Sequence, residues 1–294
     1  MRWRLIIMLL SLAFTISAER RALVIGIGEY PDVDYGWHSI NGDNDIDITK
    51  SLLIGNGFTN NNIYTLRNQQ ATYNNIIASL KRLMQLSEQN DIVYIHFSGH
   101  GQQITDLNGD EDDGFDEAWI PYDALQEPTD NYHGECHLTD DELNYYLHQI
   151  YIKIGETGRL IVVTDACHSG TSTRDITDTC TIRGTSAKFI LSENNKSKNY
   201  TSQPIQWVAI SACSDKECNR QYDSAQGLDK RQSNQSFPCG SLTYTLYLLR
   251  KQLTAMPLAD LQQQLLTIIT SILPRPQTPQ VECPARYRHQ TLLP

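Results

Sequence analysis

The sequence contains no apolar run long enough to cross a membrane as a helix, which excludes a multi-span membrane protein. Its N-terminal apolar run, Leu5 to Ile16, has twelve residues, whereas a spanning helix needs roughly 20. Excess positive charge is also absent. The net charge of −10 argues against nucleic acid as a partner. With 40% hydrophobic and 20% charged residues, the chain has the composition of globular domains rather than of disordered segments.

The first 18 residues have the pattern of a secretory signal peptide. Arg2 and Arg4 form a basic n-region, Leu5 to Ile16 forms the apolar h-region, and Ala18 supplies a small residue at its end. We therefore expect residues 1–18 to be removed on export, with a retained anchor as the alternative, and the mature protein to be periplasmic or secreted. Because strand-forming residues start at Arg21, we expect no pro-domain before the fold.

Short runs rich in Val, Ile and Tyr alternate with longer stretches of helical period, which predicts an α/β fold around a largely parallel sheet. The expected strands are 22–27, 62–66, 91–97, 160–164 and 206–211, with a short final strand after 273–284. The expected helices are 43–54, 72–86, 139–150, 241–253 and 257–273. A capping box, Thr139 to Glu142, opens the third of these helices.

Two stretches break this rhythm. Residues 106–117 hold seven carboxylates among twelve residues, and residues 171–202 form a polar insertion without apolar periodicity. Long insertions of this kind are usually functional loops or processing sites.

Two of the expected strands run into reactive side chains. One leads into Ser98-Gly99-His100-Gly101 and the other into Asp165-Ala166-Cys167-His168. Ligands of open α/β sheets bind at such carboxyl ends of strands. His168 adjoins Cys167, but successive side chains of an extended chain point to opposite faces, so His100 is the better base and Asp165 shares the sulfur's side. Buried structural residues and a metal site are the alternatives. The metal site is the weaker one, because C-x₂-C and H-x₃-H spacings are missing.

Two further motifs match known sites only in part. Asp106, Asn108, Asp110 and Glu117 match ligand places of an EF-hand loop. However, Glu111 stands where the turn glycine belongs, so a solvated acidic loop is an equal interpretation. Gly26-Ile27-Gly28 begins like a dinucleotide fingerprint, but the third glycine is missing and Pro31 follows, which argues against a nucleotide cofactor.

Seven cysteines lie after the signal-like segment. Setting Cys167 aside leaves an even number, which is compatible with disulfides in an exported protein. Six cysteines allow fifteen connectivities, and the sequence does not choose among them. The six are Cys136, Cys180, Cys213, Cys218, Cys239 and Cys283.

His96-Phe97-Ser98-Gly99-His100-Gly101 resembles the H-[YF]-S-G-H-G motif of metacaspases, and Asp165-Ala166-Cys167-His168-Ser169-Gly170 resembles their D-[SA]-C-H-S-G motif. Residues 109–117, with Pro121 and Asp123, are similar to the family's G-D-E-x-D-G-x-D-E…P-x-D stretch. The resemblance covers about 21–253 and implies the caspase-like three-layer α/β sandwich, a largely parallel sheet of about six strands with helices on both faces. It implies one peptidase domain, 19–294. The large-subunit-like part is about 19–175, the polar processing-type loop about 171–202 and the small-subunit-like part about 203–294.

The resemblance further implies a cysteine endopeptidase with Cys167 as nucleophile, His100 as general acid and base, and the backbone N–H groups of Gly101 and Cys167 as oxyanion hole. It implies an S1 pocket from Asp165, Ser98 and an aspartate of the element Asn41-Gly42-Asp43-Asn44-Asp45. Because this element is one residue shorter than the family's G-C-x-N-D, Asp45 is favoured over Asp43. Such carboxylates bind a guanidinium or ammonium group and repel acidic side chains. We therefore expect cleavage after Arg or Lys; the Q-A-C-x-G signature of true caspases is absent.

No cofactor is required for this chemistry. The resemblance implies calcium as an activator, held by Asp140 and Asp141 together with Asp175 and Asp113 or Asp116. The polar insertion is either a solvated loop or a site of self-cleavage at one of its basic residues, which are Arg174, Arg183, Lys188, Lys196 and Lys198. We expect peptide or protein substrates with Arg or Lys at P1, the residue before the cut bond, and a monomer. A non-catalytic binding or scaffold protein on the same fold is the alternative.

Overall fold

A six-stranded sheet forms the centre of the computed structural model, in the order β11-β8-β7-β3-β1-β2. The structure describes residues 18–31, 35–167, 181–191, 200, 202–214, 217–226, 236–273 and 277–294. Five strands run parallel, and the short β11 pairs antiparallel with β8. The strands are β1 Arg20–Gly26, β2 Ile63–Arg67, β3 Ile92–Ser98, β7 Arg159–Asp165, β8 Val208–Ser211 and β11 Gln280–Glu282.

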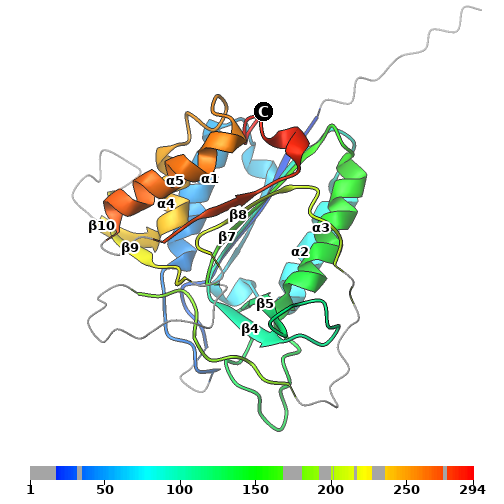
Figure 1. The fold of residues 1–294 in the computed structure, drawn as a ribbon, viewed down its shortest axis with the longest axis vertical. Coiled ribbons are helices and arrows are strands. Elements are labelled where there is room, and N and C mark those ends of the chain that lie inside the picture. Colours follow the sequence, from blue (N-terminus) through cyan, green and yellow to red (C-terminus); the bar gives the residue numbers. More distant parts are fainter. Residues whose placement is uncertain are drawn as a thin grey trace, which may run out of the picture.

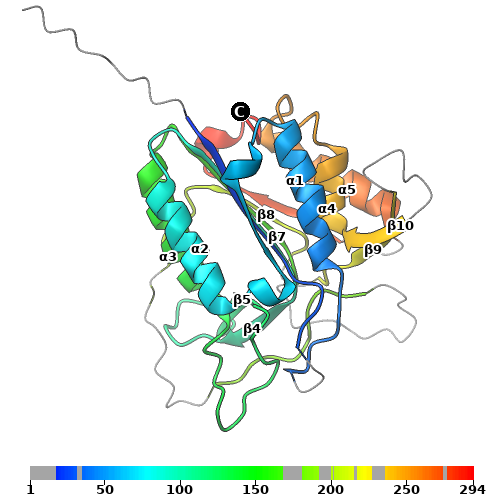
Figure 2. The same ribbon diagram turned by 180° about the vertical axis from the view of Figure 1, so that it is seen from behind.

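Helices cover both faces of this sheet, as Figures 1 and 2 show from opposite sides. On one face lie α1 Asp45–Gly55, α4 Ser241–Leu248 and α5 Leu258–Ile272, and on the other lie α2 Tyr73–Leu86 and α3 Asp140–Ile154. The strands have period 2, so their side chains alternate between two apolar cores. Val24 and Tyr94 pack with α1, α4 and α5, whereas Leu23 and Ile95 pack with α2 and α3. The expected three-layer fold is confirmed.

Helix α3 shows how the predicted capping box is divided between two tasks. The Thr139 hydroxyl accepts a hydrogen bond from the Glu142 N–H at 3.3 Å, as a helix N-cap does. The Glu142 carboxylate instead accepts a hydrogen bond from the Tyr73 hydroxyl at 2.7 Å. This bond joins the starts of α2 and α3, so the glutamate fixes the packing of two helices.

Two small sheets lie beyond the carboxyl ends of the central strands. One contains β4 Gly101–Thr105, β5 Phe115–Trp119 and β6 Leu138–Thr139, and the other is a hairpin of β9 Gln221–Gln226 and β10 Ser236–Gly240. The prediction missed all five strands. They are short or carry polar residues, and their partners are each other rather than the central sheet. Helix α4 also ends at Leu248, five residues before its expected end.

The part of the polar insertion between residues 181 and 191 is paired with other segments, so this part is not a solvated loop. Residues 181–191 form bridges to β4 and to Arg220, and Phe189 is fully buried. Within the described ranges, no helix is both long and apolar enough to cross a bilayer. The predicted signal peptide, residues 1–18, lies outside the described residues except for Ala18.

Candidate active site

The sheet register brings Cys167 and His100 to neighbouring strand ends. Strands β3 and β7 are adjacent and parallel, with Ser98 directly opposite Asp165. Cys167 and His100 each follow two residues later. Gly101 lies against the Cys167 backbone so closely that a Cβ at Gly101 would be 1.8 Å from the Cys167 carbonyl oxygen. Only glycine can therefore continue the chain after His100 at this place.

The His100 ring is held in one orientation. Its Nε2 lies 2.8 Å from the His38 carbonyl oxygen, which can only accept, so Nε2 carries the proton. Trp37 stacks on the ring with centroids 4.8 Å apart, and the Tyr30 hydroxyl accepts from the His100 N–H at 3.0 Å. Nδ1 is buried without a hydrogen-bond partner among the described residues. Burial, and then the charge of His38, lowers the pKa of His100 to about 3, which leaves a neutral ring with a free lone pair.

The Cys167 thiol is buried with 2% exposure and accepts a hydrogen bond from the Asn219 N–H at 2.9 Å. Its pKa is raised, first by a hydrogen bond with the Cys213 thiol and also by burial, while a hydrogen bond with Cys218 opposes the shift. The thiol is therefore protonated, beside a neutral His100. The described cysteines form no disulfide with one another; they are Cys136, Cys167, Cys213, Cys218, Cys239 and Cys283.

Asp45, Ser98 and Asp165 form one fully buried acidic pocket next to this pair. The Ser98 hydroxyl donates to Asp45. Asp165 accepts from the Thr243 N–H at 2.8 Å, the Thr243 hydroxyl at 2.6 Å and the Asn219 side-chain amide at 2.8 Å. These donors fix the carboxylate and compensate for its burial.

The remaining pocket wall comes from Gly240. Gly240, Asn219 and Thr243 were not predicted from the sequence as pocket residues. The Gly240 N–H donates to Asp45 at 2.8 Å, and a Cβ at Gly240 would lie 2.0 Å from an Asp165 oxygen. These residues lie 50 to 80 positions beyond Cys167 in no recognisable motif. The Asp43 carboxylate lies instead 3.8 Å from Arg67, so the structure places Asp45 in the pocket and Asp43 outside it.

Arg183, from the polar insertion, fills the acidic pocket. Its Nη1 lies 2.6 Å from an Asp45 oxygen and 3.6 Å from an Asp165 oxygen, and it donates to the Ser98 hydroxyl. The side chain is fully buried. Burial raises the pKa of Asp45 to about 6, and the Arg183 charge opposes that rise. In the described part of the chain, Nε and Nη2 of Arg183 have no hydrogen-bond partner, so the pocket binds the guanidinium through Nη1.

The Arg183 backbone lies directly on Cys167. The Cys167 N–H, one of the two expected oxyanion donors, donates to the Arg183 carbonyl oxygen at 2.8 Å. The second expected donor, Gly101, is bridged to Gly184. A Cβ at Gly184 would lie 3.3 Å from the Cys167 sulfur. When a basic side chain occupies the acidic pocket, the carbonyl group of the same residue therefore lies next to the Cys167 thiol. The neutral imidazole of His100 can then accept the thiol proton.

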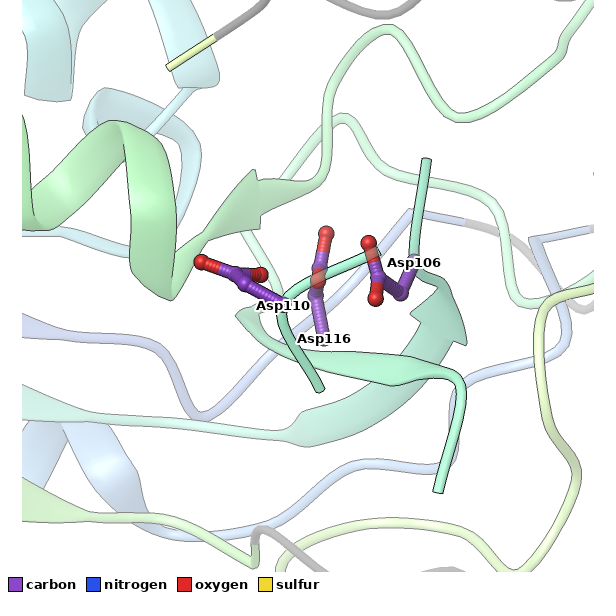
Figure 3. Close-up of side chains that lie close together, drawn as sticks. All are labelled: Asp106, Asp110 and Asp116. Atoms are coloured by element: carbon purple, nitrogen blue, oxygen red, sulfur yellow. The ribbon is translucent and has the colours of Figure 1, made fainter. Parts of the chain in front are cut away.

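The acidic segment is the turn of the β4–β5 hairpin and not an EF-hand loop between helices. Figure 3 shows Asp106, Asp110 and Asp116 side by side there, and their carboxylate oxygens lie within 4.8 Å of one another. Glu111, Glu117 and Asp140 converge in the same way. Burial, and then the charges of neighbouring carboxylates, raises the pKa of both Asp116 and Asp140 to about 8.

The other residues predicted to bind calcium have different surroundings. Asp141 accepts a hydrogen bond from the Asn108 side chain, which belongs to the acidic turn. Asp113 accepts from the Gln103 side chain at 3.2 Å and stands outside both carboxylate groups. Asp175 and His168 lie outside the described residues.

Comparison with solved structures places the fold among caspase-like proteins. A protein of Geobacter sulfurreducens aligns with a TM-score of 0.61 over 93% of this chain and 97% of its own, at 20% identity. Caspase-1 of Spodoptera frugiperda aligns with a TM-score of 0.54 over 90% of this chain and 88% of its own, at 11% identity. At these identities the likeness shows the fold alone.

Sequence comparison is more specific. Metacaspase III c of Phaeodactylum tricornutum is 37% identical over 165 residues, which is 53% of this chain and 44% of the relative. Metacaspase-1A of Aspergillus niger is 32% identical over 164 residues, 53% of this chain and 37% of the relative. The chain thus matches less than half the length of these relatives. The family model described as metacaspase, peptidase C14 domain, matches residues 20–175, more than half of the chain. The chain belongs to the metacaspase family of cysteine peptidases, as its strand-end motifs indicated.

Proposed function

We propose that the protein is an exported cysteine endopeptidase that cuts peptide bonds after Arg or Lys. The observation that carries this proposal is the position of Arg183. Its side chain lies among Asp45, Ser98 and Asp165, and its carbonyl oxygen accepts the Cys167 N–H. A basic side chain therefore occupies the acidic pocket while the carbonyl group of the same residue is hydrogen-bonded to the nucleophilic residue, Cys167. The N-terminal signal-like pattern supports export.

In the proposed mechanism, His100 Nδ1 takes the thiol proton and the Cys167 sulfur adds to the carbonyl carbon. The Cys167 N–H, with Gly101 as the second donor, stabilises the oxyanion. The imidazolium then gives its proton to the leaving amine, and water hydrolyses the thioester. The His38 carbonyl keeps Nε2 protonated throughout, so only Nδ1 exchanges protons with the reacting groups.

The pocket discriminates by charge. Two buried carboxylates attract a cationic P1 side chain, and an acidic P1 side chain would add a third negative charge without a donor to match it. Because the pocket contacts one corner of the Arg183 guanidinium, we expect Lys to be accepted as well. Lys should bind more weakly, because its side chain reaches less far than that of Arg and ends in a single ammonium group.

Covalent capture tests the assignment of the nucleophile. A peptide chloromethyl ketone ending in Arg should alkylate Cys167, and more rapidly in an Arg183→Ala variant, whose pocket is free. The Cys167→Ala variant should stay unlabelled, whereas Cys283→Ala, which removes a half-buried thiol outside the site, should be labelled like the wild type. Intact-mass and peptide mass spectrometry locate the adduct. An adduct on another cysteine, or equal labelling by an Asp-ended probe, would contradict the assignment.

We further propose Ca²⁺ as an activator bound at the β4–β5 turn. The donors there are carboxylate oxygens, which Ca²⁺ prefers. Asp140 has a buried oxygen without a hydrogen-bond partner among the described residues, which fits a cation ligand. Asp106 is less free, because it already accepts N–H groups of Asn108, Gly109 and Glu111. Binding at this turn would order β4, whose first residue is Gly101 beside Cys167.

Adding Ca²⁺ to the metal-free protein should therefore raise its unfolding temperature. A concentration of 100 times Kd contributes about 2.7 kcal/mol, or roughly 4 to 5 °C for a chain of this size. Peptidase activity should rise in parallel and fall again with a chelator. Asp116→Asn should remove both responses, and Asp130→Asn, at an exposed aspartate, should remove neither. Identical melting curves with Ca²⁺ and with chelator would refute the site.

The alternative function is a binding or scaffold protein that has kept the fold without catalysis. Nucleophile, base and acidic pocket are all present at matching positions, which favours catalysis. We propose peptides or proteins as substrates and a monomer as the working unit.

A further inference from the structure

We propose that His96 is a positioning residue for cleavage after basic side chains, and that it acts through the Thr243 hydroxyl on the pocket carboxylate of Asp165. This inference deepens the proposed function and rests on it. His96 is the first residue of the stretch that resembles H-[YF]-S-G-H-G, and it has no part in the proposed catalytic steps. It lies on β3 two residues before Ser98, so its side chain is on the face of the strand that carries the acidic pocket.

The imidazole of His96 is buried at a cost in free energy. Its exposed fraction is 1%, and the Tyr94 ring lies parallel to it with centroids 6.4 Å apart. Nδ1 is buried without a hydrogen-bond partner among the described residues, and an unpaired buried nitrogen is unfavourable. An apolar side chain would avoid this cost. The other ring nitrogen, Nε2, indicates why a histidine is present, because it lies 3.2 Å from the Thr243 hydroxyl.

The hydrogen bonds that join His96, Thr243 and Asp165 run in one direction. The Thr243 hydroxyl has one hydrogen, which it donates to an Asp165 oxygen at 2.6 Å, because a carboxylate can only accept. The hydroxyl must then accept from His96, so Nε2 carries the ring proton. Linked hydrogen bonds polarise one another, so a hydroxyl that accepts a bond donates a stronger one. His96 therefore strengthens the bond by which Thr243 holds Asp165.

A second threonine of α4 shows what the hydroxyl does without such a partner. The Thr245 hydroxyl donates to the Ser241 carbonyl of its own helix at 2.7 Å, as helical threonines often do. Thr243 is also buried, but its hydroxyl bonds to side chains of β3 and β7 instead. Its N–H lies in the first turn of α4, where no intrahelical acceptor exists, and donates to the same Asp165 oxygen at 2.8 Å. Thr243 thus fixes this oxygen with two donors.

The groups that hold Asp165 leave its charge available to a substrate. Apart from Arg183, the described donors to this carboxylate are neutral, namely the N–H and hydroxyl of Thr243 and the side-chain amide of Asn219. Burial lowers the pKa of His96 to about 4, so the ring adds no positive charge behind the pocket at neutral pH. The Asp165 oxygen that Thr243 does not hold lies 3.6 Å from Nη1 of Arg183. His96 therefore helps to orient a carboxylate toward a basic side chain without neutralising it.

The test compares kcat and KM for two reporter peptides that differ only in Arg or citrulline at P1, because citrulline has the shape of Arg without its charge. All variants are made in the full chain with Arg183→Ala, in which Arg183 does not compete for the pocket. His96→Leu removes the donor to Thr243, whereas His96→Gln keeps an amide N–H in its place. Thr243→Val removes the hydroxyl itself. Thr245→Val is the matched control, because it removes a buried hydroxyl that bonds only within α4.

His96→Leu should lower kcat/KM for the Arg reporter on the order of tenfold, the effect of one hydrogen bond to a charged group. The loss should be in KM, while kcat and the citrulline reporter change little, so the ratio of Arg to citrulline hydrolysis falls by the same factor. His96→Gln should recover most of the loss, and Thr245→Val should behave like the parent chain. Because His96 acts through Thr243, adding His96→Leu to Thr243→Val should cause no further loss.

Equal losses for the Arg and citrulline reporters in His96→Leu, or additive losses in the double variant, would show a merely structural role. Either result overturns this inference and leaves the peptidase standing. Nitrogen NMR of the His96 ring in the unmodified chain gives a check that needs neither activity nor a variant that folds. It should show the proton on Nε2, and a proton on Nδ1 overturns the inference. A chain that cleaves no Arg reporter, with Arg183 or without it, overturns the proposed function and this inference together.

Discussion

Replacing Asp165 by Asn is expected to lower kcat/KM for Arg and Lys reporter peptides by at least about 100-fold. Asp165 is fully buried and provides one of the two charges that face the cationic side chain. Leaving a buried charge without its partner costs about 3 to 5 kcal/mol, which corresponds to more than about 100-fold in rate or binding. Most of the loss should be in KM if the pocket mainly binds the P1 side chain.

The same substitution also disturbs the start of α4, because Asp165 accepts two hydrogen bonds from Thr243. The melting temperature should therefore be recorded with the kinetics. Asp43→Asn is the matched control. Asp43 precedes the pocket residue Asp45 by two positions, but its carboxylate lies near Arg67 and outside the pocket. It should keep nearly full activity. If Asp165→Asn retains wild-type kcat/KM, Asp165 is not part of the specificity pocket.

The central strands could be predicted from sequence most clearly where both faces are buried, as in β1, β3 and β7. Continuous apolar runs such as Ile92–Phe97 locate such a strand, and the observed bounds differ from the expected ones by two residues or fewer. The register that follows, with Ser98 opposite Asp165, explains why two distant motifs meet. Strands β9 and β10 could not be found in this way, because their pairing is local to a hairpin and leaves no clear alternation.

Only some of the pocket residues could be predicted from the sequence. Asp45, Ser98 and Asp165 lie in or near recognisable motifs, whereas Gly240, Thr243 and Asn219 complete the pocket through backbone and side-chain donors from the second half of the chain. A donor of this kind is defined by where the fold places it and not by its neighbours in sequence. The same is true of Cys213, whose thiol raises the pKa of Cys167.

Arg183 was the least predictable residue of the site. In the sequence it is one of several basic residues in a polar stretch, for which a solvated loop is the simplest interpretation. The structure buries it completely, because Asp45 and Asp165 compensate for the charge and the backbone on either side is paired. One of the partners that allow its burial, Asp45, lies more than 100 positions away in the sequence. No local sequence pattern could therefore have indicated that Arg183 is buried.

Discrimination between basic and acidic P1 residues is the second large effect. An Arg at P1 meets the two buried carboxylates that hold Arg183, whereas an Asp at P1 meets like charges, whose juxtaposition costs several kcal/mol. We expect kcat/KM for Arg to exceed that for Asp on the order of 1000-fold, with Lys below Arg but far above Asp.

The preference for a basic P1 residue should depend on pH. The pKa of Asp45 is raised to about 6, so Asp45 loses its negative charge as the pH falls through 6 and the preference should weaken.

The most direct measurement of the central claim is kcat/KM for three reporter peptides that differ only in Arg, Lys or Asp at P1, using the wild type and Cys167→Ala. The prediction is hydrolysis after Arg and Lys by the wild type, little or none after Asp, and none by Cys167→Ala. Equal or faster hydrolysis after Asp, or activity that survives the loss of Cys167, would contradict it.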